Sequence, residues 1–450
     1  MLMTDRLEAL AAQRRRDLGV PGLAVGIVVD GDLAWFAGLG WADVDRSVPP
    51  TPRSLARVAS VTKTFTATAI LQIRDRGLLR LDDPLERHLP EFAVVREDGG
   101  RRSDVTIRAI LTHRSGLVTE SPPTRWDTPS FPTMAEIIAA LPDTAVAVAA
   151  ESEWKYSNLG FGLLGEVVAR LGGRPYVEHV RAEIFEPLGM GDSAFQLDDA
   201  GRALAMTGYL PGEHEDRPRP APVASLLGLT AAGQLHSNVA DLARWIAFQT
   251  GAHPAGDRVL TRATLAESHE VRYVQPDWTM GQTVAWRIVR RGERLIHNHG
   301  GSVHGFNSNV AFHLPTRTGA IVLANLWPSL IASQLAADLL EIVVDGAHPR
   351  AAAAGSPSAA PAGLRPLLGR YRAEPGIDAD IEWRDGALRL LAPAGSFPLH
   401  APVELVPVAG RERVFRLAHG RGAGEIAAFT QDGDGRPGFE LGGFAYRRRW

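Results

Sequence analysis

Two strand-like runs around a tight turn form the first clear pattern in the chain, over residues 23–41. Mostly apolar residues occupy positions 23–29 and 33–39, and Asp30-Gly31-Asp32 separates the two runs. An Asp-Gly pair between such runs is typical of the turn of a β-hairpin. The pattern therefore predicts a hairpin here.

A helical period replaces the strand pattern after residue 60. Val61, Phe65 and Ile73 fall on one helical face, and Gly77 follows as a residue type that commonly ends helices. Loops punctuated by proline and short helices continue to about residue 290. The clearest further helical stretches are residues 161–171 and 241–250.

Strand character returns before residue 346. The runs are residues 294–297, 307–313 and 320–325, and a helix is predicted over residues 331–344. Strands at both ends of this region therefore flank a mainly helical middle. That order predicts an α/β domain over residues 1–346, with a helical insertion at about residues 81–290.

The last hundred residues have a different composition. Residues 347–366 are rich in alanine, proline, glycine and serine, which is typical of a linker. Residues 367–450 then contain short strand-like runs separated by turn residues, which predicts an all-β accessory domain. The clearest runs are residues 381–383, 387–391, 403–408 and 414–417.

The composition narrows the class of protein. A chain of 450 residues is too long for one ordinary core, so at least two domains are expected. A hydrophobic fraction of 45% and a charged fraction of 22% are those of a soluble globular protein. The net charge of −3 disfavours nucleic acid as a partner. Cysteine is absent, which excludes disulfides, a thiol nucleophile and thiolate metal sites.

The sequence predicts neither a targeting segment nor a membrane partner. Residues 1–18 carry charges throughout and lack the apolar stretch of a signal peptide. Residues 318–337 are nearly uncharged, but Asn325 and Pro328 interrupt them, so a strand followed by a helix is expected. We therefore expect a soluble, cytoplasmic protein. A homodimer stays open.

The use of lysine is unusual. Lysine and arginine total 48, yet the only lysines are Lys63 and Lys155. Arginine cannot lose its proton in a protein, whereas a desolvated lysine can. A site that needs a basic amine must therefore use one of these two residues. For Lys155, we expect no special role.

Lys63 follows Ser60 by one helical turn, in Ser60-Val61-Thr62-Lys63. This spacing places both side chains on one helical face. A serine hydroxyl needs an adjacent base to act as a nucleophile, and Lys63 can serve if burial lowers its pKa. The alternative is a serine that caps the helix, beside a solvated lysine.

Two further motifs carry polar groups suited to the same chemistry. In Tyr156-Ser157-Asn158, the tyrosine can relay a proton and Asn158 can order a substrate or the lysine. In His299-Gly300-Gly301-Ser302, the glycines permit close approach, and the amide of Ser302 can pair with that of Ser60 as an oxyanion hole. The alternatives are a packed tyrosine at a helix start and a glycine-rich turn with a surface histidine.

Taken together, these motifs resemble those of the class C β-lactamase and penicillin-binding-protein-like family of serine hydrolases, over roughly residues 5–345. The matching stretches follow the family's order: residues 59–67, 81–84, 111–117, 154–158, 187–190, 232–233, 237–242 and 299–301. The resemblance implies an α/β sandwich, with an antiparallel sheet flanked by helices and a mostly helical inserted subdomain. It also implies a lipocalin-like C-terminal domain.

The resemblance also implies a mechanism through an acyl-enzyme, with no cofactor and no metal. The implied roles are Ser60 as nucleophile, Lys63 and Tyr156 as general base, Asn158 as an ordering residue, and His299, Gly301 and Ser302 for substrate and oxyanion binding. Ser115 lies in a stretch of the family that looks structural, and no chemistry is assigned to it.

One departure from the family bears on the substrate. True β-lactamases and cell-wall peptidases of this family usually carry Lys-Thr-Gly where this chain has His299-Gly300-Gly301. A permanent cation helps to hold a carboxylate, whereas histidine is largely neutral at pH 7. The sequence therefore favours small esters, amides or D-amino-acid peptides over penicillins.

Several other functions compete with a serine esterase or amidase. A metal hydrolase and an α/β-hydrolase are disfavoured, because neither a His-Glu-x-x-His helix nor a Gly-x-Ser-x-Gly elbow occurs. A D-aminopeptidase and a weak β-lactamase stay open. So does a penicillin-binding-protein-type thioesterase that releases or cyclises nonribosomal peptides. An inactive binding module of the same fold is the last alternative.

Overall fold

A computed structural model of the chain divides, by its internal contacts, into two compact units. The first unit contains residues 1–83 and 161–349, and the second contains residues 84–160 and 350–450. The domain boundaries predicted at residues 346 and 366 stay predictions, and residues 347–359 of the predicted linker lie outside the described residues. The structure describes residues 3–93, 104–212, 217–276, 280–291, 294–345, 360–374, 376–384, 386–391, 403–418, 422–431 and 436–449.

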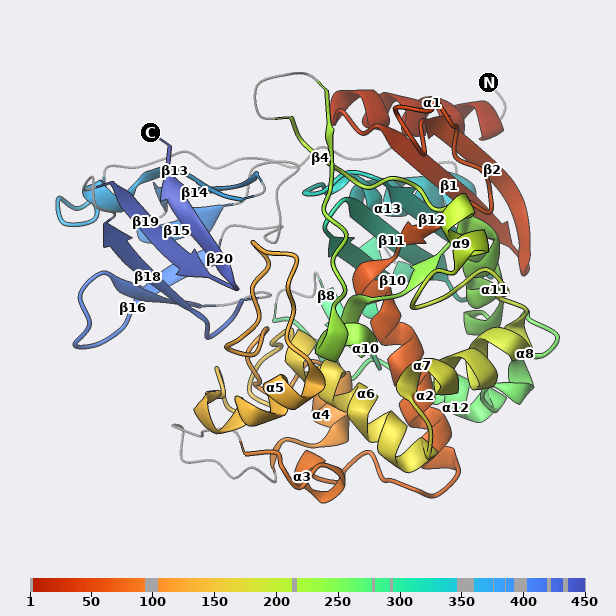
Figure 1. Ribbon diagram of the computed structural model, residues 1–450, viewed down its shortest axis with the longest axis horizontal. Helices are drawn as coiled ribbons and strands as arrows, with labels where there is room; N and C mark the ends of the chain where they lie inside the picture. The colour runs from red at the N-terminus through yellow and green to blue at the C-terminus, as the bar shows by residue number, and fades with distance from the viewer. Residues whose placement is uncertain are drawn as a thin grey trace. The chain divides into compact units, whose positions relative to one another are not determined.

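An eight-stranded sheet forms the centre of the first unit (Figure 1). Its strand order is β2-β1-β12-β11-β10-β9-β8-β7, and every neighbouring pair is antiparallel. The N-terminal hairpin therefore joins strands from the far end of the unit. The strands are β1 (Gly22–Val29), β2 (Asp32–Gly40), β7 (Tyr273–Val274), β8 (Met280–Gln282), β9 (Arg287–Arg291), β10 (Arg294–Val303), β11 (Phe306–His313) and β12 (Thr318–Ala324).

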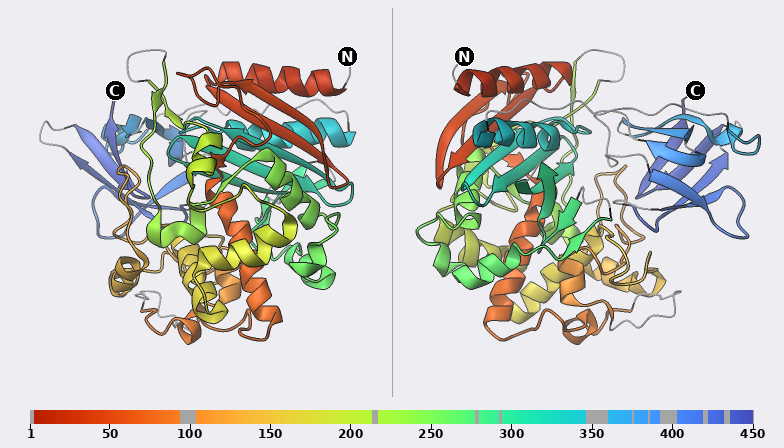
Figure 2. Two further views of the ribbon diagram at one scale, coloured as in Figure 1. Left: turned by 45° about the vertical axis from the view of Figure 1, so that its right-hand side comes forward. Right: turned by 180° about the vertical axis from the view of Figure 1, so that it is seen from behind.

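Helices cover both faces of this sheet (Figure 2). They are α1 (Met3–Asp17), α11 (Val239–Gln249) and α13 (Ile331–Asp345). Val25 and Ile27 of β1 pack in the apolar core that α1 and α13 share. A Cβ added to Gly26, between them, would lie 2.4 Å from Val239 of α11. Because successive strand residues point to opposite faces, α11 covers the face opposite α1 and α13. The predicted α/β sandwich is confirmed.

The first unit also contains further helices, most of them short, and two-residue strands outside the sheet. They are β3 (Ala56–Arg57), η1 (Ala59–Val61), α2 (Thr62–Asp75), α7 (Tyr176–Val180), η4 (Arg181–Phe185), α8 (Glu186–Leu188), α9 (Asp199–Leu204), β4 (Tyr209–Leu210), β5 (Arg219–Pro220), η5 (Leu227–Leu229), α10 (Thr230–Gly233), β6 (His236–Ser237), η6 (Gly256–Arg258) and α12 (Arg262–Ser268). Helix α6 (Asn158–Gly172) begins in the second unit. Helix α2 is buried from Thr62 through Ile73, so its position is fixed by packing on all sides.

The second unit combines short helices with a closed β-barrel of eight strands. The barrel is antiparallel throughout, and β20 pairs back to β13. This barrel confirms the predicted all-β accessory domain. The elements are α3 (Leu85–His88), α4 (Ile107–Leu111), α5 (Met134–Ala139), η3 (Leu141–Asp143), η7 (Arg365–Leu367), β13 (Gly369–Ala373), β14 (Ile377–Arg384), β15 (Ala387–Leu391), β16 (Val403–Pro407), β17 (Val414–Leu417), β18 (Ile426–Gln431), β19 (Pro437–Leu441) and β20 (Phe444–Arg448).

The local predictions hold in most places. The hairpin is confirmed, and its turn residues Asp30 and Gly31 both have positive φ, at 49° and 96°. The helix after residue 60 is confirmed, and Gly77 follows its end with φ 75°. The strand predicted to end at residue 297 is longer, because β10 continues to Val303 and pairs with β11 through its two glycines.

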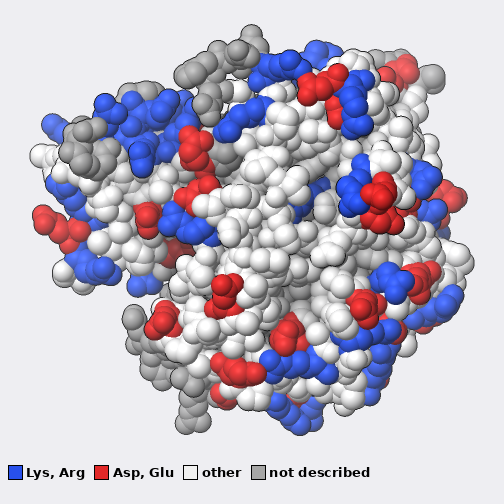
Figure 3. All heavy atoms as spheres, in the orientation of Figure 1, with Lys and Arg blue, Asp and Glu red and all other residues white. Residues whose placement is uncertain are grey.

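Charged side chains of both signs are interspersed over the face of the molecule in Figure 3. Two arginines of the barrel are locally compensated, since Arg370 donates to Asp380 at 2.9 Å and Arg372 donates to Asp378 at 2.6 Å. Among the helices that the structure describes, none combines the length and the apolar character needed to cross a membrane.

Candidate active site

Ser60 lies in the short turn η1, directly before the buried helix α2. Its side chain is partly exposed, while the residues on either side of it, Ala59 and Val61, are buried. Ala59 adopts φ 47°, a left-handed conformation that costs a non-glycine residue about 1 kcal/mol or more. The surrounding structure must therefore hold this turn in place.

Three contacts hold the turn that carries Ser60. The backbone N–H of Val58 donates to the carbonyl of Leu235 at 2.9 Å, which continues the pairing of β3 with β6. The hydroxyl of Ser308 on β11 donates to the carbonyl of Val58 at 2.8 Å. The hydroxyl of Thr62 donates to the carbonyl of Ala59 at 2.6 Å. The central sheet and α2 thus both fix the position of Ser60.

Lys63 lies one turn further along, and its side chain is fully buried. Its Nζ is 3.2 Å from the Oγ of Ser60, within hydrogen-bond distance. The same amine donates to the carbonyl of Ala232 at 2.6 Å and lies 5.6 Å from the centre of the Phe161 ring. The hydrogen bond to Ala232 thus anchors the Lys63 amine, which is directed at the hydroxyl of Ser60.

Strand β10 packs against η1 because Gly301 has no side chain. A Cβ at this position would lie 2.1 Å from the carbonyl oxygen of Val58 and 2.4 Å from the Oγ of Ser308. The main chain of β10 therefore lies directly against the turn that carries Ser60. On the other side of the strand, a Cβ on Gly300 would lie 3.1 Å from the Oγ of Ser333 on α13.

Alternation along β10 decides which side chains of the predicted motif His299-Gly300-Gly301-Ser302 face the serine turn. His299 shares a strand face with Gly301, whereas the side chain of Ser302 shares a face with Gly300. His299 is buried, and its Nδ1 lies 2.8 Å from the carbonyl of Gly300. It is thus a buried strand residue, not the surface residue of a turn. The hydroxyl of Ser302 points toward the side of α13, so only its backbone amide is suited to an oxyanion.

In the second unit, Tyr156 is buried in a segment built around His113. The two rings lie 4.5 Å apart, and His113 has φ 55°. The N–H of Lys155 donates to the carbonyl of His113 at 2.7 Å, and the N–H of Ser157 donates to its Nδ1 at 3.2 Å. His113 therefore fixes the backbone on both sides of Tyr156.

Asn158 begins helix α6 and is held from residues 119 and 120. Its backbone N–H donates to the carbonyl of Thr119 at 2.8 Å. Its side-chain amide donates to Oε1 of Glu120, which also accepts from the indole N–H of Trp126 at 2.9 Å. The hydroxyl of Thr119 donates to the carbonyl of Tyr156 at 3.1 Å. One short segment thus positions both predicted residues.

The structure therefore places the predicted site residues in two groups. Ser60 and Lys63 come together against β10 in the first unit, while Tyr156 and Asn158 share a segment of the second unit. The joint action of the two groups stays a prediction.

Sequence reasoning missed the residues that support the second group. His113 was visible as part of the stretch at residues 111–117, but its contact with Tyr156 was not. No local pattern in the sequence singles out Thr119, Glu120 or Glu425. Glu425 lies 270 residues from Lys155 in the sequence, yet its carboxylate contacts that side chain.

Comparison with known proteins gives a consistent result. A family model described as β-lactamase matches residues 7–343. Penicillin-binding protein 4 of Amycolatopsis lactamdurans is 29% identical over 391 residues, which cover 83% of this chain and 97% of that protein. Beta-lactamase-like protein 2 of Dictyostelium discoideum is 28% identical over 328 residues, or 71% of this chain, and the match spans only 58% of that protein.

The fold is also found among solved structures. The octameric penicillin-binding protein homologue from Pyrococcus abyssi superposes with a TM-score of 0.68 at 23% identity, and the match covers 99% of each chain. The match covers both the α/β sandwich and the C-terminal barrel.

Proposed function

Because this chain belongs to the β-lactamase family of serine hydrolases, we propose that it cleaves small esters or amides through an acyl-enzyme on Ser60. The observation that carries the proposal is the fully buried amine of Lys63, 3.2 Å from the hydroxyl of Ser60. A serine hydroxyl needs an adjacent base to become a nucleophile. Burial disfavours a charged ammonium, so a buried amine is suited to accept the proton.

In the proposed first step, the Oγ of Ser60 forms a bond to the substrate carbonyl carbon while its proton passes to Lys63. The resulting oxyanion accepts hydrogen bonds from the backbone amides of Ser60 and Ser302. Collapse of this intermediate breaks the bond to the alcohol or amine, and Tyr156 passes to the leaving group the proton that Lys63 accepted from Ser60. The products are the free alcohol or amine and an acylated Ser60.

In the second step, water attacks the acyl-enzyme. One proton of this water passes through Tyr156 and Lys63 to the Oγ of Ser60, and cleavage of the bond between Oγ and the acyl carbon releases the carboxylic acid. Asn158 orders the groups on the side of Tyr156. The chain itself supplies the nucleophile, the base and the proton relay of this scheme, and the reaction consumes only the substrate and water.

The histidine at position 299 supports a preference for substrates without a carboxylate next to the cleaved bond. A cation at position 299 would pair strongly with such a carboxylate, whereas a histidine is largely neutral at pH 7. His299 is buried on the face of β10 that packs against the serine turn. We therefore propose simple esters and amides, including D-aminoacyl amides, ahead of penicillins.

The test combines a covalent probe with a substrate panel. A fluorophosphonate should add one mass label to the protein at Ser60, and Ser60→Ala should abolish the label. Ser152→Ala is the matched control, because Ser152 is exposed and its hydroxyl donates to the carbonyl of Ala149 in its own turn. Folded protein that takes no label would favour an inactive binding module.

The panel then separates the remaining functions. It contains p-nitrophenyl esters, D-aminoacyl amides, a chromogenic cephalosporin and a peptidyl thioester offered with and without an amine acceptor. Esters and amides should be turned over fastest. Cyclisation or aminolysis of the thioester at a higher rate than any hydrolysis would favour a thioesterase of the peptide-releasing type.

A further inference from the structure

An ion pair between a fully buried lysine and a mostly buried glutamate links the barrel to the segment that carries Tyr156. The side chain of Lys155 is fully buried, and its Nζ lies 2.7 Å from Oε1 of Glu425 in the turn between β17 and β18. Burial alone would raise the pKa of the Glu425 carboxyl, but the Lys155 ammonium and the hydrogen bonds from Thr119 outweigh it and lower this pKa. The pair is therefore charged, and its partners compensate each other.

The ion pair belongs to a closed ring of hydrogen bonds around the backbone of Tyr156. Lys155 Nζ also donates to the hydroxyl of Thr119 at 2.7 Å and to the carbonyl of Tyr156 at 3.2 Å. The same Thr119 hydroxyl donates to that carbonyl at 3.1 Å. The backbone N–H of Thr119 donates to Oε1 of Glu425 at 3.1 Å. The carboxylate of Glu425 thus closes the ring from the barrel.

The turn that carries Glu425 lies against Ala147, which belongs to the same unit of the structure. Gly424 has φ 77°, and a Cβ added to it would lie 2.6 Å from the carbonyl of Ala147. Arg416 of β17 donates to the carbonyls of Ala147 at 3.2 Å and of Gly424 at 2.8 Å. Glu425 is therefore presented to Lys155 by a turn whose neighbouring residue, Gly424, lies directly against Ala147.

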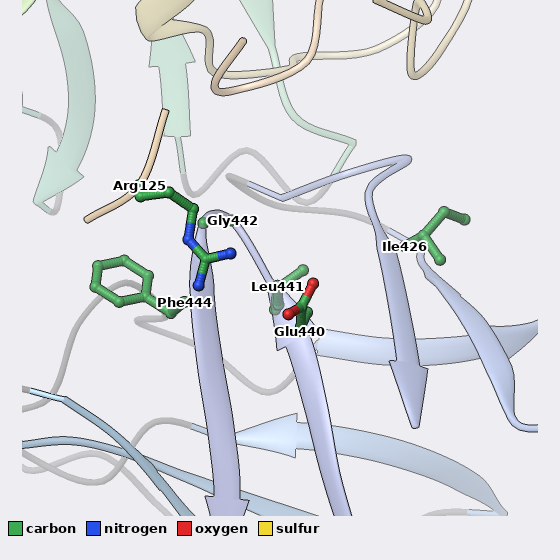
Figure 4. Close-up of a pocket in the computed structure, with 7 residues that line it drawn as sticks. Arg125, Ile426, Glu440, Leu441, Gly442 and Phe444 are labelled. Atoms are coloured by element: carbon green, nitrogen blue, oxygen red, sulfur yellow. The ribbon is translucent and has the colours of Figure 1, made fainter. Parts of the chain in front are cut away.

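A second barrel turn contacts the same part of the insertion. A Cβ added to Gly443, between β19 and β20, would lie 3.2 Å from the carbonyl of Thr124 and 3.4 Å from Trp126. Trp126 in turn shares Glu120 with Asn158. Figure 4 shows Arg125 of the insertion beside this turn, where it lines a pocket with residues of β19 and β20.

We propose that Glu425 is a positioning residue for catalysis: the barrel supplies the carboxylate that holds Lys155 and Thr119, and through them the backbone of Tyr156. This inference rests on the proposed role of Tyr156 in proton transfer. It also assigns a function to the second of the two lysines and makes the barrel part of the catalytic machinery. Proton transfer needs its groups held to within a fraction of an ångström, so a loosened Tyr156 slows the chemical step.

The test uses the full-length protein and an ester from the panel. Glu425→Gln removes the charge but keeps the size of the side chain, and it leaves the Lys155 ammonium buried without its carboxylate. The matched control is Glu404→Gln. Glu404 also pairs with a cation, but its partner is Arg389 of the barrel, at 3.9 Å, and not a residue of the segment that carries Tyr156. Rates are divided by the amount of Ser60 that a fluorophosphonate can label, so loss of folded protein does not count as loss of catalysis.

We expect Glu425→Gln to lower kcat about ten- to a hundredfold, with little change in KM. Glu404→Gln should retain the kcat of the unaltered protein. A double variant, Lys155→Met with Glu425→Leu, removes both charges, and such replacements are often neutral for stability. It should unfold at a temperature close to that of the unaltered protein, yet its kcat should stay low, because the bonds to Thr119 and Tyr156 are gone.

A merely structural ion pair gives a different result. Glu425→Gln would then lower the unfolding temperature but not the kcat per labelled serine, or the double variant would regain full kcat; either outcome overturns the inference while the proposed function stands. If Glu425→Gln does not fold, the double variant decides alone. If the unaltered protein takes no label and turns over no substrate, the proposed function fails, and this inference fails with it.

Discussion

A single methyl group added at Gly301 would push β10 away from the turn that carries Ser60. In Gly301→Ala, the new Cβ would lie 2.1 Å from the carbonyl oxygen of Val58. Ordinary contact needs about 3.4 Å, so β10 and the serine turn must separate by about 1.3 Å, and a shift of this size in a catalytic group costs about a hundredfold in rate. Neither side can give easily, because both contacts belong to the main chain or to Ser308, which is itself bonded to Val58.

The neighbouring glycine provides the control. In Gly300→Ala the nearest atom is the Oγ of Ser333 at 3.1 Å, the end of a side chain that can rotate away. We expect Gly301→Ala to lower kcat/KM about a hundredfold and to cost about 1–3 kcal/mol of unfolding free energy from overpacking. Gly300→Ala should lose little of either quantity.

The assay is kcat/KM on a p-nitrophenyl ester, with the rate of fluorophosphonate labelling as a substrate-independent measure of Ser60. Urea unfolding of both variants separates the effect on stability from the effect on the rate. A Gly301→Ala protein with full kcat/KM and an unchanged labelling rate would refute the assignment of this strand as the wall against which Ser60 is held.

Further predictions concern Ser60 and Lys63, Ser302, and Glu425. Ser60→Ala should abolish turnover of the panel, and Lys63→Arg should be nearly as damaging, because an arginine keeps the charge but cannot accept a proton; an arginine variant with most of the activity would show that Lys63 is not the base. Ser302→Ala should keep kcat/KM within about twofold, because the backbone amide that is proposed to bind the oxyanion is retained; a large loss would place the hydroxyl in the reaction. The pKa of Glu425 is lowered from its ordinary value of 4.5, so its contribution to stability is fully present above about pH 4.5 and is lost as the pH falls through the lowered pKa. Unfolding temperatures measured between pH 7 and pH 3 should therefore fall more steeply in the unaltered protein than in Glu425→Gln, and parallel curves would contradict this.

Much of the local structure could be predicted because it depends on short-range patterns. The Asp-Gly pair specifies the N-terminal hairpin, since both turn residues tolerate positive φ. The spacing of three between Ser60 and Lys63 brings the two side chains together on one helical turn. The alternating runs after residue 367 indicate strands, and the structure closes them into a barrel.

Contacts between residues far apart in the sequence could not be predicted, because they depend on the tertiary structure. Alternation along a strand indicates which residues share a face, but not what packs against that face. The pairing of β10 with β11 carried the strand through Gly300 and Gly301, buried His299 and turned the side chain of Ser302 away from the serine.

That a serine and a lysine lie one helical turn apart follows from the order of residues alone, because helical geometry acts over four residues. The surroundings of the rest of the site depend on how distant segments pack together. Lys155 carried no local signal of a role, since its partner Glu425 lies 270 residues away in a different type of domain. A buried charge needs compensation from whichever segment the fold brings beside it, and that segment is chosen by packing and not by local pattern.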